Sequence, residues 1–162
     1  MANHLETLIS QYYDWQGWIV KKNVRVGRRR ELGGYDGELD VVVYNPATGK
    51  VIHYEPSTDA SSWEKRAEKY EHKFQMGRRY ISKEVLPWLA PDFELEQIAV
   101  FFHVPAHRRA FQGAKAISID ELVGMIRDKI KKEGRVGKNA IPEQYDLLRT
   151  IQLLICGYMK PC

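Results

Sequence analysis

The spacing of apolar residues predicts that the chain begins with one helix followed by three strands. Apolar side chains recur at helical spacing over residues 3–14, which indicates an amphipathic helix. Three runs rich in β-branched residues then predict strands at residues 18–26, 38–44 and 50–55. Because residues 45–49 have the composition of a turn, the second and third strands are expected to form a hairpin.

A long helix is predicted next, from Ser61 or Ser62 to about residue 83. Serine is a preferred residue at a helix start, because its hydroxyl accepts a hydrogen bond from a backbone N–H of the first turn. One face of this helix carries Trp63, Ala67, Tyr70, Phe74, Gly77 and Ile81. An apolar face at this spacing is typical of a helix that packs on a core.

The remaining elements complete the predicted fold class. Strands are expected at residues 97–104 and 114–119, and Asp120 is expected to cap the helix that follows them. Residues 134–140 have the composition of a linker, and Ile141-Pro142 is expected to open a final helix. This alternation predicts an α/β protein with a mixed sheet flanked by helices.

The last helix is more apolar than a surface helix needs to be. The 162-residue chain divides into a core domain, residues 1–133, and a C-terminal part, residues 134–162, with the linker and this helix. The apolar residues of the helix are Ile151, Leu153, Leu154, Ile155, Cys156, Tyr158 and Met159. The helix therefore either packs between elements of its own domain or supplies a partner surface, and we expect a homodimer through it.

Composition excludes several classes of protein. No apolar run approaches the roughly 20 residues that cross a bilayer, and the N-terminus lacks the pattern of a secretory signal. A cytoplasmic protein with no membrane partner is therefore expected. The two cysteines, Cys156 and Cys162, have no histidine at zinc spacing, so neither a zinc site nor a disulfide framework is indicated.

The positive charge is concentrated in one stretch of the chain. The net charge is +4, and residues 15–30 contain basic but no acidic side chains. Phosphate contacts to nucleic acid are expected from Arg25, Arg28, Arg29 and Arg30. The alternative is a solvated basic face that binds no ligand.

Two acidic residues lie in runs that are otherwise apolar. Asp40 is in the second strand and Glu55 ends the third, so the hairpin brings both near one another. A carboxylate in such a run needs a partner, because burial of an unpaired charge is costly. The two acids are therefore expected to bind one hard cation such as Mg²⁺, or Mn²⁺. The alternative is that both acids form salt bridges at the strand ends.

These residues resemble the core of the PD-(D/E)XK nuclease superfamily. Residues 35–42, Tyr-Asp-Gly-Glu-Leu-Asp-Val-Val, are similar to the strand that carries the metal-binding aspartate in Mrr-like and Holliday-junction-resolvase-like members. Residues 116–122 and the order of elements also match. The resemblance covers roughly residues 3–130. It implies a restriction-endonuclease-like αβββαβ core over residues 1–133, with an extra C-terminal helix.

The resemblance assigns roles to individual acids. Asp40 and Glu55 would hold the metal, and Glu6 on the first helix would be an additional acid near it. An exposed position on the helix is the alternative for Glu6.

The chain departs from the family at the lysine of the motif. The family expects lysine two residues after the glutamate, where this chain has Ser57. Some members carry this lysine on the following helix, and Lys65 and Lys69 are the nearest candidates here. Helical geometry directs both away from the face of Trp63, so neither is well aimed.

Two functions follow from these features. The first is a metal-dependent nuclease that hydrolyses phosphodiester bonds in DNA. The second is a catalytically incomplete nuclease-fold module that binds nucleic acid without cleaving it, which Ser57 favours. A structural subunit whose basic face is incidental is a third class.

Overall fold

A computed structural model describes residues 4–59, 61–90 and 92–157 of the chain. It contains a six-stranded mixed sheet in the order β1-β2-β3-β4-β6-β5. The strands are β1 (Ile19–Arg28), β2 (Tyr35–Tyr44), β3 (Val51–Pro56), β4 (Leu95–Phe101), β5 (Ala110–Phe111) and β6 (Ala114–Ser118). The helices are α1 (His4–Trp15), α2 (Trp63–Tyr80), α3 (Ile119–Glu133) and α4 (Asp146–Ile155), with a π-helical turn η1 (Ile81–Val85) and a 3₁₀ turn η2 (Ala106–Arg108). The predicted α/β class with a mixed sheet flanked by helices is confirmed.

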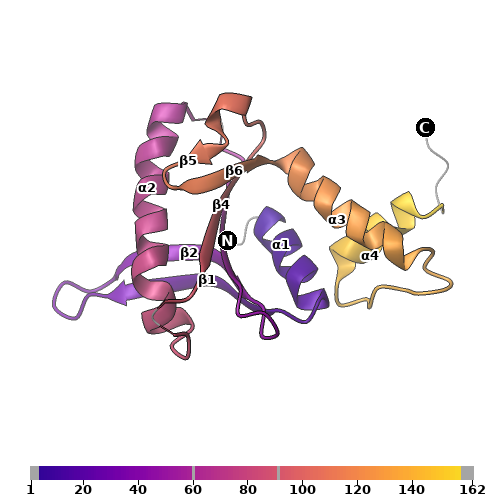
Figure 1. The fold of residues 1–162 in the computed structure, drawn as a ribbon, viewed down its shortest axis with the longest axis horizontal. Coiled ribbons are helices and arrows are strands. Elements are labelled where there is room, and N and C mark those ends of the chain that lie inside the picture. The colour runs from indigo at the N-terminus through magenta and orange to yellow at the C-terminus, as the bar shows by residue number, and fades with distance from the viewer. Residues whose placement is uncertain (1–3, 60, 91, 158–162) are drawn as a thin grey trace.

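The two faces of the sheet are covered by different helices (Figure 1). Side chains alternate along a strand, so Val41 and Val43 of β2 pack with α1, α3 and α4, whereas Val42 packs with α2 and η1. The first three strands are antiparallel, and β3, β4 and β6 are parallel. The parallel strands are joined by crossovers that contain a helix or a long connection, as their geometry requires.

The predicted apolar face of the long helix is confirmed. Tyr70, Phe74 and Gly77 are buried in α2, and Ile81 is buried at the start of η1. Ser62 is the N-cap, since its side chain accepts a hydrogen bond from the backbone N–H of Lys65. The helix ends at Tyr80 rather than near residue 83, because the chain continues as the π-helical turn.

Several predicted boundaries are wrong. The first strand ends later and the second begins earlier than predicted, because β1 continues to Arg28 and β2 begins at Tyr35. Asp120 is not the cap of α3: Ser118 is, and Glu121 completes a capping box with it. The final helix begins at Asp146, several residues after Ile141-Pro142.

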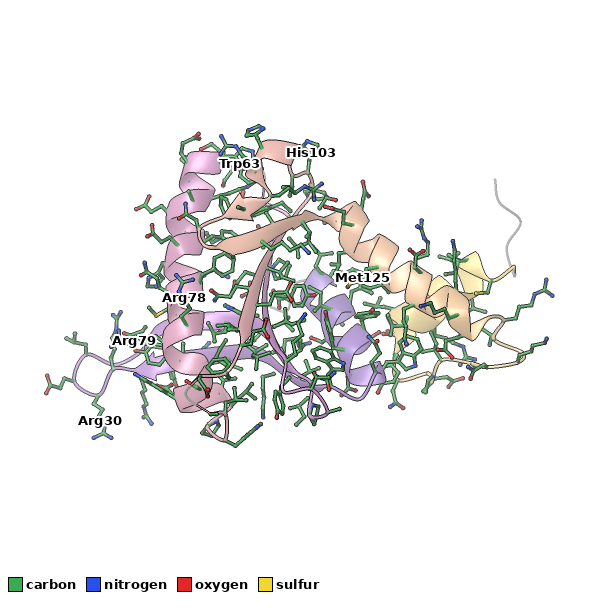
Figure 2. All side chains as sticks on the ribbon, in the orientation of Figure 1. Arg30, Trp63, Arg78, Arg79, His103 and Met125 are labelled. Carbon is green, nitrogen blue, oxygen red and sulfur yellow. The ribbon has the colours of Figure 1, made fainter. Side chains whose placement is uncertain are left out.

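The fourth strand is also shorter than predicted. β4 ends at Phe101, so His103 lies beyond the strand and is exposed, and Figure 2 shows it at the edge of the molecule. The short edge strand β5 has no counterpart among the predicted elements. Its two residues form a strand because they pair with β6, and the local sequence pattern does not predict this pairing.

Helix α4 packs on its own chain through one face. Leu148 and Gln152 are fully buried, and Ile151 and Ile155 pack against the core that α1 and α3 also line. Leu153 is exposed to 37% and Leu154 to 48%, whereas Tyr158 and Met159 lie outside the described residues. The internal packing accounts for only part of the apolar surface of the helix.

The homodimer through this helix stays a prediction. Exposed leucines on a helix that is already anchored suit a self-complementary contact about a two-fold axis. Light scattering at micromolar concentration should give twice the mass of the chain, and Leu153→Glu with Leu154→Glu should return the mass of one chain. A monomer mass for the wild type that persists as concentration rises would mean that α4 serves its own domain alone.

Candidate functional site

Asp40 and Glu55 lie next to each other at the point where the antiparallel pairing of β2 with β3 ends. Val41 of β2 is paired with Tyr54 of β3, so the two acids are the next residues along the two strands. The backbone N–H of Asp40 donates to Oε1 of Glu55 at 3.3 Å. Glu55 is completely buried, and the Asp40 side chain is 13% exposed. The predicted convergence of these two carboxyl groups is therefore confirmed.

Lys73 of α2 joins the two acids. Its Nζ donates to Oδ2 of Asp40 at 2.8 Å and also to Oε2 of Glu55. The Lys73 side chain is 22% exposed, so its ammonium lies between a buried carboxylate and the solvent. Burial would lower the pKa of Lys73, but the negative charges of Glu55 and Asp40 raise it above its usual value. The ammonium is therefore charged at neutral pH.

The two carboxyl groups differ in their acidity. Burial, followed by the closeness and negative charge of Glu55, raises the pKa of Asp40 to about 8, against the lowering effect of Lys73. Burial would likewise raise the pKa of Glu55, but the hydrogen bond from His53 and the charge of Lys73 hold it well below its usual value. At neutral pH Lys73 therefore compensates the ionised Glu55, while Asp40 is largely protonated. When Asp40 ionises as well, the site carries one negative charge more than positive.

A chain of hydrogen bonds through Gln97 and His53 holds Glu55 on the side away from Lys73. The Gln97 amide donates from Nε2 to the Phe74 carbonyl at 3.0 Å, and its Oε1 accepts from Nη1 of Arg78 at 2.7 Å. These two partners set the orientation of the amide. Its Nε2 therefore donates its second proton to Nδ1 of His53, 3.1 Å away.

The orientation of Gln97 determines the tautomer of His53. Because Nδ1 is an acceptor, the ring proton of neutral His53 lies on Nε2, which donates to Oε1 of Glu55 at 2.7 Å. His53 is completely buried, and Gln97 is 6% exposed. A buried carboxylate held in this way keeps one orientation, with its second oxygen directed at Lys73.

A cavity of about 360 Å³ opens beside Asp40 and Lys73. Its lining is Gly37, Glu38, Asp40, Lys69, His72, Lys73 and Met76. Asp40 is therefore reachable from solvent, whereas Glu55 is covered. A ligand in this cavity would meet two acids, Asp40 and Glu38, together with the Lys73 ammonium and a second basic side chain, Lys69.

The lysine that reaches the acids is not one of the two expected. Lys65 is exposed, and no ion pair in the described part of the chain joins it to Asp40 or Glu55; Lys69 is exposed too and only lines the cavity. Asp40 and Glu55 face the third turn of α2 rather than its first, and Lys73 is about 12 Å further along the helix axis than Lys65. The backbone N–H of Ser57 donates to the carbonyl of Val100, and the Ser57 hydroxyl accepts from the backbone N–H of Asp59. These bonds give Ser57 a structural role in the turn after β3.

Glu6 is buried rather than exposed. It is 6% accessible on α1, and its Oε2 has no hydrogen-bond partner in the parts of the chain that the structure describes. No interaction in those same parts links it to Asp40 or Glu55. The role that the resemblance implies for Glu6 therefore stays a prediction.

The four arginines expected to contact phosphates fall into two kinds. Arg25 pairs with Glu38 at 3.6 Å, and Arg29 pairs with Asp36 at 2.9 Å. Arg28 and Arg30 are exposed, and neither has an acidic partner within ion-pair distance among the described residues. Arg28, Arg29 and Arg30 line a second cavity, of about 620 Å³, at the β1–β2 turn.

Reasoning from the sequence missed Lys73, His53 and Gln97 as members of the site. A usable signal was present for Lys73, which stands between Tyr70 and Phe74 at the flank of the buried face of α2. A lysine there can lay its aliphatic stem along the core and reach inward with its charge. His53 carried a signal as well, as a polar residue in the same buried strand and on the same face as Glu55.

The donor set suits a hard divalent cation. Among residues 4–59, 61–90 and 92–157, no three histidine, cysteine or acidic side chains are grouped as a metal site. Magnesium, however, is commonly held by one or two carboxylates, with waters and substrate phosphates completing its shell. Asp40 and Glu55 provide two such carboxylates, and when Asp40 is ionised the two carboxylates and the single ammonium carry a net negative charge that a cation can offset. The residues therefore fit Mg²⁺ or Mn²⁺.

Comparison with known proteins does not place the chain in a family. No protein-family model matches it, and no curated protein matches it significantly. No helix in the described ranges has both the length and the apolar character needed to span a bilayer.

Proposed function

We propose that the chain is a metal-dependent nuclease with a restriction-endonuclease-like core, which hydrolyses phosphodiester bonds in DNA. The cluster of Asp40, Glu55 and Lys73 beside a cavity that is open to solvent supports this proposal most directly. Asp40 and Glu55 would hold Mg²⁺ or Mn²⁺, which stabilises negative charge on a phosphate and lowers the pKa of a bound water. Its site of action is intracellular DNA, and the compartment we propose is the cytoplasm.

Each residue of the cluster contributes a separate property. Glu55 is buried and held by His53, so it supplies a permanent negative charge in one orientation. Asp40 lines the cavity and supplies the second carboxylate on the solvent side. Lys73 brings a positive charge next to both, where it can offset charge that develops on a phosphate during attack by water.

A DNA-binding module without cleavage is the second candidate. One observation favours it: the Lys73 ammonium itself bridges the two carboxylates and so provides the counter-charge that a metal would bring. Ser57 at the position of the motif lysine points in the same direction. The nuclease predicts cleavage that depends on Lys73, whereas the binding module predicts no cleavage by the wild type or by any variant.

Replacing Lys73 should separate these two functions. In the nuclease, Lys73→Met should slow cleavage of supercoiled plasmid in Mg²⁺ by about 100-fold, because charge stabilisation next to the phosphate is lost. Lys73→Arg should retain part of the rate, since the positive charge remains. The measurement is the rate of plasmid nicking and linearisation in Mg²⁺ and in Mn²⁺.

A lysine outside the cavity on the same helix is the matched control. Lys65→Met removes the same charge from an exposed position and should leave cleavage within a fewfold of the wild type. A wild-type protein that retains DNA in a salt-sensitive manner but cleaves none in either metal would instead establish the binding module.

A further inference from the structure

The β1–β2 hairpin extends beyond the rest of the sheet as a two-stranded ribbon. β2 pairs with β3 only over Val41–Tyr44, whereas β1 and β2 remain paired out to Arg28 and Tyr35. Figure 1 shows the ribbon passing α2 and ending at one extreme of the long axis, with α3 and α4 at the other. No further strand among the described residues therefore pairs with its outer end on either side.

The base of the ribbon is fixed to the end of α2. Asp36 accepts from Nε of Arg29 at 2.9 Å and from the hydroxyl of Tyr80, and the N–H of Gly27 donates to Glu84 at 3.1 Å. Gly27 has φ +69°, and a Cβ there would lie 2.6 Å from the Tyr80 hydroxyl. Only glycine permits this approach, so the ribbon projects at a set angle from the helix.

The turn beyond this base combines two free cations with an apolar side chain. Arg28 and Arg30 have no acidic partner within ion-pair distance in the described part of the chain, and Figure 2 shows Arg30 directed away from the protein. Leu32 is 87% exposed. Glu31 is the acidic residue of the turn, and no ion pair joins it to either arginine among the described residues.

A single exposed leucine is common on protein surfaces, but Leu32 lies beside two unpaired arginines at the tip of a narrow ribbon. Proteins that bind the minor groove of DNA use arginine to contact it and insert an apolar side chain between base pairs, which unstacks one step and bends the duplex. A narrow ribbon with Leu32 at its tip and unpaired Arg28 and Arg30 beside it presents that combination. We infer that the tip enters the minor groove of duplex DNA and that Leu32 wedges into a base step.

The ribbon also connects this contact to the candidate active site. Gly37 and Glu38 of β2 line the cavity that contains Asp40. The strand from Tyr35 to Asp40 is about 17 Å long, about half a helical turn of B-DNA, and Leu32 lies in the turn beyond Tyr35. The inference deepens the proposed function, on which it rests for the identity of the ligand, and it places the unstacked step away from the phosphate that is cut.

Binding without cleavage tests the wedge. Fluorescence anisotropy of a short duplex in EDTA gives the affinity and its salt dependence, and 2-aminopurine in the duplex reports unstacking. Leu32→Ala should bind about tenfold more weakly with an unchanged salt slope and should lose the 2-aminopurine signal at saturation. Arg28→Ser with Arg30→Ser should lower the salt slope by about two and keep the 2-aminopurine signal at saturation.

Two sets of variants at the far end of the molecule are matched controls. Met125→Ala removes an exposed apolar side chain from α3, and Lys131→Ser with Lys132→Ser removes two charges from the same helix. Both should bind and unstack the duplex like the wild type. Leu32→Ala should unfold at the same temperature as the wild type, which would show that the substitution changes the turn and not the fold.

The outcomes separate this inference from the nuclease proposal. Leu32→Ala with wild-type affinity and signal would overturn the wedge, even if plasmid is cleaved. Equal affinity of the wild type for duplex RNA would also overturn it, because the minor groove of A-form RNA is wide and shallow. If unstacking depends on Leu32 but the protein cleaves no DNA, the wedge is supported and the nuclease proposal is rejected.

Discussion

Asp40→Asn should abolish binding of Mn²⁺ and reduce cleavage of DNA by about 1000-fold or more. The substitution keeps the shape of the side chain but removes the carboxylate that lines the cavity beside Lys73. A single buried carboxylate, Glu55, already paired with that lysine, then remains to attract a cation. Calorimetric titration with Mn²⁺ should show one site in the wild type and no heat in the variant.

The fold should survive this substitution. The raised pKa of Asp40 means that its charged form is disfavoured in the folded state, so removal of the charge relieves a cost of folding at neutral pH. The unfolding temperature of Asp40→Asn should therefore equal or exceed that of the wild type. Asp128→Asn, at an exposed position of α3, is the control that should leave Mn²⁺ binding unchanged. No heat and no thermal protection by Mn²⁺ in the wild type would refute the metal site.

The same pKa predicts how metal binding depends on pH. A cation binds the deprotonated carboxylate, and below about pH 8 it must displace a proton from Asp40. The apparent affinity for Mn²⁺ should therefore rise with pH by up to about tenfold per unit, and level off above about pH 8. Titrations at several pH values measure this slope. An affinity that does not change with pH would contradict the raised pKa of Asp40.

Gly77→Ala should destabilise the protein, although alanine favours helices over glycine. A Cβ at Gly77 would lie 2.4 Å from Nδ1 of His53 and 2.7 Å from Nε2 of Gln97, so both buried side chains would have to move. Overpacking of this kind costs about 1–3 kcal/mol, and the hydrogen bonds that hold Glu55 are lost with it. We expect a net loss of about 2 kcal/mol and an unfolding temperature lower by about 6 °C.

Gly124→Ala on α3 is the matched control. Gly124 is also a helical glycine, but nothing lies within 4 Å of its added Cβ. Alanine there should stabilise the protein by about 0.5–1 kcal/mol, so the two substitutions should act in opposite directions. Equal unfolding temperatures for both variants would mean that α2 does not press against His53 as closely as the structure shows.

The sequence by itself determined the order of the main helices and strands and which two acids meet. Alternation along a strand put Asp40 and Glu55 among apolar residues, and the short turn between their strands required them to be neighbours. The apolar face of α2 followed from helical spacing in the same way. These are local properties, because each depends on residues close together in the chain.

The tertiary structure alone decided which lysine completes the cluster and what stands behind it. The choice among Lys65, Lys69 and Lys73 depends on how far α2 is shifted along the sheet, and no short-range pattern records that shift. Gln97 joins His53 because the parallel pairing of β4 with β3 places the two residues side by side. The ribbon formed by residues 27–37 could not be predicted from the sequence for the same reason. Its strands are stabilised by pairing and by contacts with Tyr80 and Glu84, which lie far away in the sequence.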